Sequence, residues 1–440
     1  MTGLDGYYRE PTIAGERIVF VCETDLWSVS TEGGRALRLT SHVVHARSPA
    51  LSPDGSQLAF VGREEGVFEV YLQSAEGGLA KRLTWQGAYC LVLGWSEDGE
   101  WIHYASHAGV MPRLGPRLWR VRASGGAPEL LPYGPAARLV DGAGGRVLGR
   151  NIGDPARWKR YRGGRTGELW IDREGKGEFS RLLSDLRGNV ADPAWIGARL
   201  YFLSDHEGHG NLYSCDPHGA DLRRHSHHED VYARNAKSDG KRIVYQVAAE
   251  LWLFDPAGGA PRKLPITTAS SKPQLQRRFV SPSRYLEGVD VHPKAHSVAL
   301  TVRGKPYTCG LWEGEVVQHG VRDGVRYRLT SYLPDGESFV ALADTSGEEE
   351  LELQRLLPRD SAEEAPEPER LEGLDLGRPI SMEAAPVGKQ VALVNQRHEL
   401  IHVDLEAKTS KVLDRCEYGR LLGFCWSPDG RWIAYGYRGS

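Results

Sequence analysis

The densest group of potential metal ligands in this chain is the run His225-Ser226-His227-His228-Glu229-Asp230. Imidazole and carboxylate groups at this density can bind zinc or nickel. The run lies, however, where other repeats of the chain have a polar turn, and the stretch 205–209 (Asp-His-Glu-Gly-His) occupies a similar hairpin tip. We therefore interpret both stretches as solvated turns and predict no metal site.

A second group is basic and lies within residues 157–165. Guanidinium and ammonium groups at this density can hold a peptide carboxylate through charge-assisted hydrogen bonds. They can equally pair with acids of a neighbouring repeat or a second subunit, so both interpretations stay open. The predicted peptide or assembly contact consists of Arg157, Lys159, Arg160, Arg162 and Arg165.

Nucleophilic catalysis has little support in the sequence. It contains no Gly-x-Ser-x-Gly elbow, which an α/β-hydrolase nucleophile would need. Ser41 and His42 are adjacent, so in a strand their side chains would point to opposite faces. No glycine-rich loop follows a strand and opens a helix, as a nucleotide site requires. We predict no catalytic residue and no cofactor in this chain.

Composition limits the classes of partner. The 440 residues include 55 Lys and Arg and 58 Asp and Glu, for a formal net charge of −3. A nearly neutral chain has no bulk attraction to nucleic acid or to an anionic membrane. We therefore expect neither as a partner.

Compartment is predicted from the cysteines and the N-terminus. The six cysteines lie far apart without a CxxC pair, which favours free thiols in a reducing compartment over a disulfide framework or zinc site. The first ten residues contain no apolar run, so we expect no signal peptide. No stretch approaches the apolar length of a membrane helix. The expected location is cytoplasmic.

The elements that must position any site come from a repeat that runs along the whole chain. Each unit has a turn with Asp-Gly or a similar pair, a short apolar strand and a strand with an aromatic residue. It ends with a short strand in which a basic residue precedes an apolar one. Asp-Gly supplies the positive φ of a tight hairpin. The turns precede strands predicted at 57–60, 101–104, 242–245, 338–340 and 432–435. The aromatic strands are predicted at Leu26-Trp27, Val70-Tyr71, Leu118-Trp119, Leu169-Trp170, Leu212-Tyr213, Leu251-Trp252 and Leu311-Trp312.

A repeat of this length predicts one blade of a β-propeller. A single small antiparallel sheet cannot bury both faces alone, whereas stacking sheets around an axis buries them against each other. The abundance of turn formers, with 52 Gly and 25 Pro, agrees with an all-β fold. Six blades are predicted at 8–41, 42–88, 89–135, 136–188, 189–230 and 231–274.

A second series of blades is predicted after a linker near residue 270. Its units run over 276–320, 321–378 and 379–420, and a last unit at 421–440 has a turn and one strand. We thus predict two domains, a six-bladed β-propeller over 1–275 and an incomplete second propeller over 276–440. The unpaired edge of the last unit suggests a fragment, a partner or a swapped copy that completes the ring.

The fourth blade carries a string that resembles the tricorn protease family. The string is VLGRN at 147–151 followed by WKRYRGGRTGELWI at 158–171, and the opening PTIAGERIVFVC at 11–22 is also similar to that family. The resemblance implies a large cytosolic serine peptidase that assembles as a homohexamer. Such peptidases have a six-bladed propeller, a seven-bladed propeller, a PDZ domain and a catalytic core.

The resemblance also implies a function. Members cut oligopeptides left by the proteasome or similar proteases, aminopeptidases finish the work, and the propellers filter substrate and product. This chain ends inside the second propeller, before the PDZ domain and the core, so no residue inherits a catalytic role. We expect it to gate and to assemble, and to be inactive alone. The alternative is a stand-alone TolB-like propeller scaffold that binds a protein partner.

Overall fold

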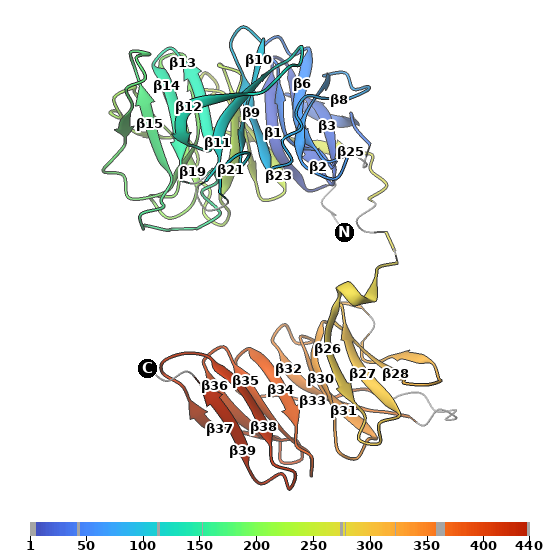
Figure 1. The fold of residues 1–440 in the computed structure, drawn as a ribbon. Coiled ribbons are helices and arrows are strands. Elements are labelled where there is room, and N and C mark those ends of the chain that lie inside the picture. Colours follow the sequence, from blue (N-terminus) through green and yellow to red (C-terminus); the bar gives the residue numbers. More distant parts are fainter. Residues whose placement is uncertain are drawn as a thin grey trace. The chain divides into compact units, whose positions relative to one another are not determined.

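The computed structural model describes residues 6–41, 45–111, 115–151, 153–272, 276–277, 279–321, 323–357 and 366–437. The chain divides into two compact units, residues 1–276 and 277–440 (Figure 1). Within the described ranges, the helical elements amount to one 3₁₀ turn, η1 (Pro282–Arg284). The all-β fold predicted from the sequence is confirmed.

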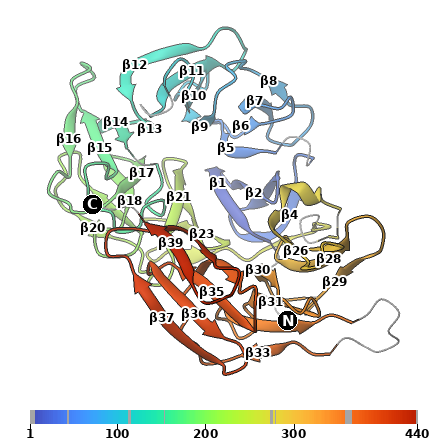
Figure 2. The same cartoon turned by 60° about the horizontal axis from the view of Figure 1, so that its bottom comes forward.

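Six sheets form a ring in the first unit (Figure 2). Each sheet has four antiparallel strands in chain order, and the first strand of each lies nearest the axis; residues 266–268 add a fifth strand to the first sheet. The strands of the first three blades are β1 (Tyr8–Ala14), β2 (Arg17–Cys22), β3 (Asp25–Ser30), β4 (Gly33–Arg38), β5 (Arg47–Leu51), β6 (Gln57–Gly62), β7 (Glu69–Ser74), β8 (Lys81–Arg82), β9 (Cys90–Trp95), β10 (Trp101–Ser106), β11 (Arg117–Arg122) and β12 (Glu129–Pro135).

The other three blades repeat this plan and bring the ring back to the first blade. Their strands are β13 (Arg138–Gly142), β14 (Gly145–Arg150), β15 (Glu168–Asp172), β16 (Ser180–Leu182), β17 (Val190–Ile196), β18 (Arg199–Ser204), β19 (Asn211–Cys215), β20 (Arg223–Arg224), β21 (Ala233–Ser238), β22 (Ile243–Val247), β23 (Glu250–Phe254) and β24 (Arg262–Lys263).

The turn between the first two strands of a blade shows why the sequence repeats Ser-x-Asp-Gly. Ser52 Oγ donates to Asp54 at 2.5 Å and accepts the amide of Gln57 at 2.9 Å. Gly55 has a φ of 72°, which glycine adopts without steric cost. Hydroxyls of Ser52 and Ser56 donate to the Asp54 carboxylate and lower its pKa to about 2. The motif therefore satisfies the polar groups of the turn locally.

The core lies between neighbouring blades. Val19, Val21 and Leu26 of the first blade pack against Leu58 and Phe60 of the second, and all five are almost completely buried. Each blade thus removes the apolar face of its neighbour from water, at about 25 cal/mol for each Å². This is the packing that makes a single repeat insufficient and a ring stable.

The ring closes through a strand that returns to the first blade. Strand β25 (Ile266–Thr268) pairs in parallel with β4, with Ile266 opposite Gly34. Gly34 N donates to the Pro265 carbonyl at 2.7 Å, and Tyr8 Oη donates to the Ile266 carbonyl at 3.1 Å. The sequence-based boundary that placed 266–268 in the sixth blade is wrong, because the open edge of β4 offers these residues a backbone partner.

The second unit contains three four-stranded sheets and one two-stranded sheet. It is part of a second β-propeller, as predicted. Its strands are β26 (Leu286–Val291), β27 (Ser297–Val302), β28 (Lys305–Gly310), β29 (Val316–Gln318), β30 (Tyr327–Tyr332), β31 (Ser338–Ala343), β32 (Glu350–Arg355), β33 (Glu369–Leu371), β34 (Pro379–Ala384), β35 (Gln390–Asn395), β36 (Glu399–Asp404), β37 (Thr409–Arg415), β38 (Leu421–Trp426) and β39 (Ile433–Tyr437).

Two predictions for this unit are wrong. The pair Leu311-Trp312 was expected in an aromatic strand, but it follows the end of β28, and Trp312 is exposed. The last repeat holds two strands, β38 and β39, instead of one. In both places a short apolar run does not reveal whether the backbone finds a partner strand.

Candidate functional site

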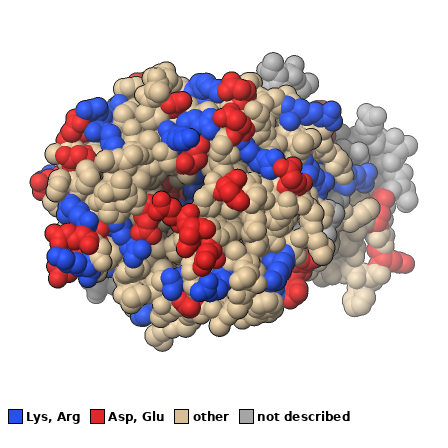
Figure 3. Space-filling view, turned by 90° about the horizontal axis from the view of Figure 1, so that it is seen from above, with Lys and Arg blue, Asp and Glu red and all other residues tan. Residues whose placement is uncertain are grey.

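The innermost strands of the six blades surround the axis of the first unit. Strand β1 packs against β5 and β21, β9 against β5 and β13, and β17 against β13 and β21. The ring is therefore continuous around its axis, and we call the region between its innermost strands the channel. Figure 3 shows a hollow at the centre of one face, with acidic side chains on the rim and basic ones deeper inside.

Four of the innermost strands contain a β-bulge whose first residue has a positive φ. These residues are Glu10 (48°), Ser48 (47°), Asp192 (48°) and Asn235 (53°). A bulge breaks the side-chain alternation and redirects a side chain. The Glu10 carboxylate accepts the amide of Ser48 at 2.6 Å and so ties two adjacent blades together.

Charged side chains of the innermost strands pair beside the channel. Arg138 Nε donates to Asp192 Oδ1 at 2.8 Å, and Arg47 lies 3.5 Å from Glu10. Arg234 Nε donates to Asp154 Oδ2 at 2.9 Å. Asp154 belongs to the loop between β14 and β15, so this pair joins the fourth blade to the sixth.

Lys237 differs from these three arginines. Its Nζ donates to the carbonyl of Leu93. Leu93 lies in the third blade and Lys237 in the sixth, which are opposite each other in the ring (Figure 2). The lysine side chain therefore crosses the axis of the channel.

The Leu93 carbonyl is available because β9 bulges there. His103 pairs with Gly94 and Tyr104 with Val92, so Leu93 is the extra residue. An extra residue in a bulge leaves its backbone groups outside the ladder. Lys237 likewise follows directly on the bulge of β21.

The surroundings of Lys237 disfavour its charged form. Burial, followed by repulsion from Arg138, lowers the pKa of Lys237 from 10.5 to about 8, against the attraction of Asp192 and Glu10. A lysine whose pKa lies this far below its ordinary value is a candidate functional group on physical grounds.

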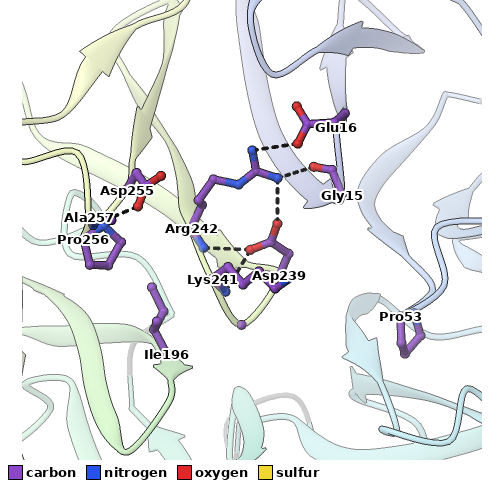
Figure 4. Close-up of a pocket in the computed structure, with 11 residues that line it drawn as sticks. Gly15, Glu16, Pro53, Ile196, Asp239, Lys241, Arg242, Asp255, Pro256 and Ala257 are labelled. Carbon is purple, nitrogen blue, oxygen red and sulfur yellow. Dashed lines mark hydrogen bonds and ion pairs between the residues drawn. The ribbon is translucent and has the colours of Figure 1, made fainter.

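A pocket of about 770 Å³ opens at the mouth of the channel (Figure 4). Its lining comes from turns of several blades and includes Glu16, Asp239 and Arg242. The Arg242 guanidinium donates to Glu16 Oε1 at 3.2 Å, to Asp239 Oδ2 at 3.2 Å and to the Gly15 carbonyl. Burial lowers the pKa of Arg242 but its bonds to Asp239 and Glu16 outweigh this and raise it. The mouth is thus polar and of mixed charge.

The predicted basic contact, residues 157–165, lies in the loop between β14 and β15. Two of its five members form hydrogen bonds with the fifth blade. Arg160 N donates to Asp205 Oδ2 at 2.8 Å, and Arg162 Nη1 donates to Asp205 Oδ1 at 3.3 Å. Asp205 is fully buried and also accepts the amide of Asn189 at 2.8 Å. Through these contacts, the sequence string at 158–171 helps to join the fourth blade to the fifth.

The other three members of the basic contact point elsewhere. The Arg157 guanidinium lies 5.9 Å from the ring centre of Trp158, and Lys159 Nζ lies 5.4 Å from that of Tyr232. Arg165 is exposed. The structure therefore does not gather the five basic residues into one cluster.

The histidine run at 225–230 is divided between two environments. His225 Nε2 lies 2.6 Å from Ser214 Oγ, and its ring packs between Tyr201 and Phe254. His228 packs instead against Trp252 and Tyr245. Burial lowers the pKa of His225 to about 4. No group of three metal-ligating side chains with suitable geometry occurs in the part of the chain that the structure describes.

Sequence reasoning missed the channel residues. A signal was present in Glu10-Pro11, Ser48-Pro49 and Asp192-Pro193, which interrupt apolar strands. Proline cannot donate to a ladder, so within a strand it marks an edge or a bulge. Lys237 carries no comparable signal, because its importance depends on a carbonyl in a distant blade.

The described residues include no helix of the length and hydropathy needed to cross a membrane. The sequence matches the tricorn protease N-terminal beta propeller domain over residues 5–260. It matches the tricorn protease second beta propeller domain over residues 286–440.

Individual relatives agree with these matches. Tricorn protease homolog 1 of Streptomyces coelicolor is 37% identical over 440 residues, which cover 98% of this chain and 41% of the relative. The tricorn protease homolog of Saccharolobus solfataricus is 34% identical over 442 residues, which cover 99% of this chain and 39% of the relative. The crystal structure of the tricorn protease superposes with a TM-score of 0.79 at 27% identity, with 99% of this chain and 42% of that chain covered.

The chain thus spans about 40% of the length of these relatives. The two matched domains together account for both compact units, and the first alone covers more than half of the chain. This chain belongs to the tricorn protease family.

Proposed function

We propose that this chain is the propeller region of a tricorn-like serine peptidase and that its six-bladed ring selects oligopeptides for passage. Bond cleavage belongs, in this proposal, to a region of the peptidase outside the chain. The observation that supports it most is the axial channel, which Lys237 crosses to reach Leu93. A channel that one side chain can bridge is too narrow for a folded domain.

The proposed peptidase works in the cytoplasm on oligopeptides left by larger proteases, and aminopeptidases complete the degradation. We further propose that it is a homo-oligomer, a hexamer by family resemblance. Arg157, Trp158 and Arg165 are exposed on the β14–β15 loop. Trp158 is not a member of the predicted basic contact, but Arg157 and Arg165 are, and with the exposed Lys159 they are proposed to meet a second subunit or a peptide.

The apolar faces of the second unit agree with a longer protein. Val289 and Val291 on β26 are exposed, as are Leu422 and Tyr437 on β38 and β39. Large apolar side chains on the faces of propeller sheets are ordinarily covered by neighbouring blades. We propose that further blades of the same peptidase cover them.

The mass of the native protein tests this proposal directly. Lysates of the source cells are separated under denaturing conditions and probed with an antibody raised against this chain. The expected band is much heavier than the 48.7 kDa of the chain. A band at the mass of the chain itself would contradict the proposal and favour a stand-alone scaffold.

Hydrolysis by the purified chain is a second test. Fluorogenic oligopeptides are incubated with the 440-residue chain, and no turnover is expected. Turnover that persists through purification and stops with serine-directed reagents would place the catalytic groups in this chain. It would refute the proposal that bond cleavage belongs to a region outside the chain.

A further inference from the structure

The last four-stranded sheet of the second unit ends in a long strand with a free edge. Strand β37 pairs with β36 along its length and is the outermost strand in the order β34-β35-β36-β37 (Figure 2). Six of its seven residues are exposed, and Asp414 is half-buried. The backbone N–H and C=O groups on the free side of such a strand can pair with a strand of another chain.

The outer strands of the other described four-stranded sheets offer a partner less backbone. Strands β8, β20 and β24 have two residues each, and β16, β29 and β33 have three. Strand β12 has seven, but its Pro132 and Pro135 have no N–H to donate. Strand β4 is already paired with β25. Among these outer strands, β37 thus combines length, exposure and an uninterrupted set of backbone donors.

A bulge in β37 brings two opposite charges to the same face of the strand. Lys411 is paired with His402, and Asp414 is paired with Leu400, with one extra residue of β37 between them. The two partners are two positions apart in β36, so their side chains point to the same face. Lys411 and Asp414 therefore share that face, although residues three apart in a regular strand would not.

Both charges are available to a second chain. Lys411 is exposed. Tyr435 Oη donates to Asp414 Oδ2 at 2.5 Å, and the amide of Arg415 donates to Oδ1 at 2.8 Å. These hydrogen bonds lower the pKa of Asp414, so the carboxylate is ionised at neutral pH. A carboxylate has about four acceptor sites, so Asp414 can still accept an ammonium group.

The sequence Lys411-Val412-Leu413-Asp414 is complementary to itself when two copies of the strand run antiparallel. Lys411 of each copy then lies opposite Asp414 of the other. Val412 and Leu413, which are 48% and 44% exposed, meet between the two ion pairs. Opposite charges directly across a sheet stabilise it and like charges destabilise it. A parallel pairing in register would place each charge opposite its own kind.

We propose that β37 forms a contact between two copies of this chain, through antiparallel pairing of their β37 strands about a two-fold axis. The two four-stranded sheets then continue as one, and the same surface serves both copies. This inference rests on the proposed homo-oligomer and names one of its contacts. Because a single strand buries little surface, the contact by itself is weak and dissociates on dilution.

Sedimentation velocity of the 440-residue chain tests the contact. A monomer–dimer equilibrium is expected at concentrations up to about 1 mM. In Lys411→Asp both ion pairs become pairs of like charge, so the dimer should weaken about tenfold or more. Lys241→Asp makes the same change of charge at an exposed position of the first unit. It is the matched control and should associate as the unmodified chain does.

Two results would overturn the proposal. One is a chain that stays monomeric throughout this range of concentration. The other is an association that a folded Lys411→Asp variant leaves unchanged, which would assign the contact to the exposed apolar faces of the second unit instead. Circular dichroism establishes that the variants are folded.

A mixture of two variants tests the antiparallel register. Asp414→Lys alone should also weaken the dimer, because it places Lys411 opposite a lysine. When Lys411→Asp and Asp414→Lys are mixed, a dimer of the two unlike chains regains both ion pairs. The mixture should therefore associate more strongly than either variant alone, and the absence of any gain would refute this register.

These outcomes are independent of the native mass and of hydrolysis. A heavy native band together with a monomeric 440-residue chain would refute the β37 contact and leave the proposed peptidase standing. A native band at the mass of the chain, together with rescue in the mixture, would refute the peptidase and leave the contact standing. Failure of this inference is therefore distinguishable from failure of the proposed function.

Discussion

At the scale of residues, the molecule places its buried charges where two blades meet. Asp205 joins the fourth and fifth blades, and Asp192 joins the fourth, fifth and sixth through Arg138 and the Ala236 amide. A buried carboxylate is stable only when donors surround it. The same principle makes Lys237, which has a neutral partner, the exception in the channel.

Lys237 is expected to lower the stability of the first unit at neutral pH. Because its pKa is about 8 in the folded chain and 10.5 ordinarily, folding disfavours its charged form. Lys237→Met should raise the free energy of unfolding at pH 7 by about 1–2 kcal/mol, less than the full shift implies because the side chain is not completely buried.

The pH dependence checks the cause of this gain. The unfolded chain binds more protons than the folded chain between pH 8 and 10.5, so the stability of the unmodified chain rises with pH across that window. The advantage of Lys237→Met should shrink from pH 8 and vanish above about 10.5. Denaturant titrations at pH 7, 9 and 11 measure the difference in free energy of unfolding between the variant and the unmodified chain. A difference that stays constant over these pH values would exclude the charge of Lys237 as its cause.

Asp205 should matter more for stability than the exposed basic residues of the β14–β15 loop. Asp205→Ala leaves the amides of Asn189 and Arg160 without their acceptor in a fully buried place. We expect a loss of about 2–4 kcal/mol. Arg165→Ala, an exposed change on the same loop, should stay within about 0.5 kcal/mol. Thermal unfolding compares the two, and similar midpoints would contradict this view of the loop.

At the scale of elements, the ring depends on a strand of three residues. β25 adds a parallel partner to β4 and removes the open edge that the first blade would otherwise present. Its short length suffices because Tyr8 and Gly34 of the first blade also bond to this segment. Closure therefore links the end of the first unit to its beginning.

Polar substitution in β25 should open the ring. Ile266 is buried against the first blade and Thr267 is exposed. Ile266→Asp would bury a carboxylate and should cost about 3 kcal/mol or more. Thr267→Asp makes the same chemical change on the exposed face and is the control. Calorimetry should show a lower midpoint for Ile266→Asp alone, and equal midpoints would mean that β25 does not hold the ring.

At the scale of the whole molecule, each unit has its own cores. The clusters that contain Phe20, Phe60 and Phe202 draw only on residues before 277, and those that contain Val391 and Phe339 only on later residues. A domain that has its own core can fold alone. The first unit also carries its own closing strand.

A fragment of residues 1–276 should therefore fold by itself. We expect its thermal transition to match the transition of the first unit in the full chain, because β25 is included. A fragment of residues 1–264 lacks that strand and should unfold at a lower temperature. Near-ultraviolet circular dichroism reports the packing of the aromatic core in both, and a disordered 1–276 fragment would show that the second unit is required.

The repeat, its Asp-Gly turns and the aromatic strands were enough to predict blades from the sequence. The reason is that turn chemistry and strand patterns act over a few neighbouring residues. The string at 158–171 identified the family for the same reason, since it is contiguous. The prediction that its five basic residues form one contact remains untested, although Arg160 and Arg162 turn toward Asp205.

Only the tertiary structure decided the channel and the closure. Lys237 meets Leu93 across 144 positions of sequence, and Ile266 pairs with Gly34 from the opposite end of the unit. Neither contact leaves a local pattern, because each depends on how six similar sheets are arranged around an axis. The sequence by itself therefore determined the blades and the family. The ring decided which charges face one another, since backbone groups and ammonium ions find their partners through space.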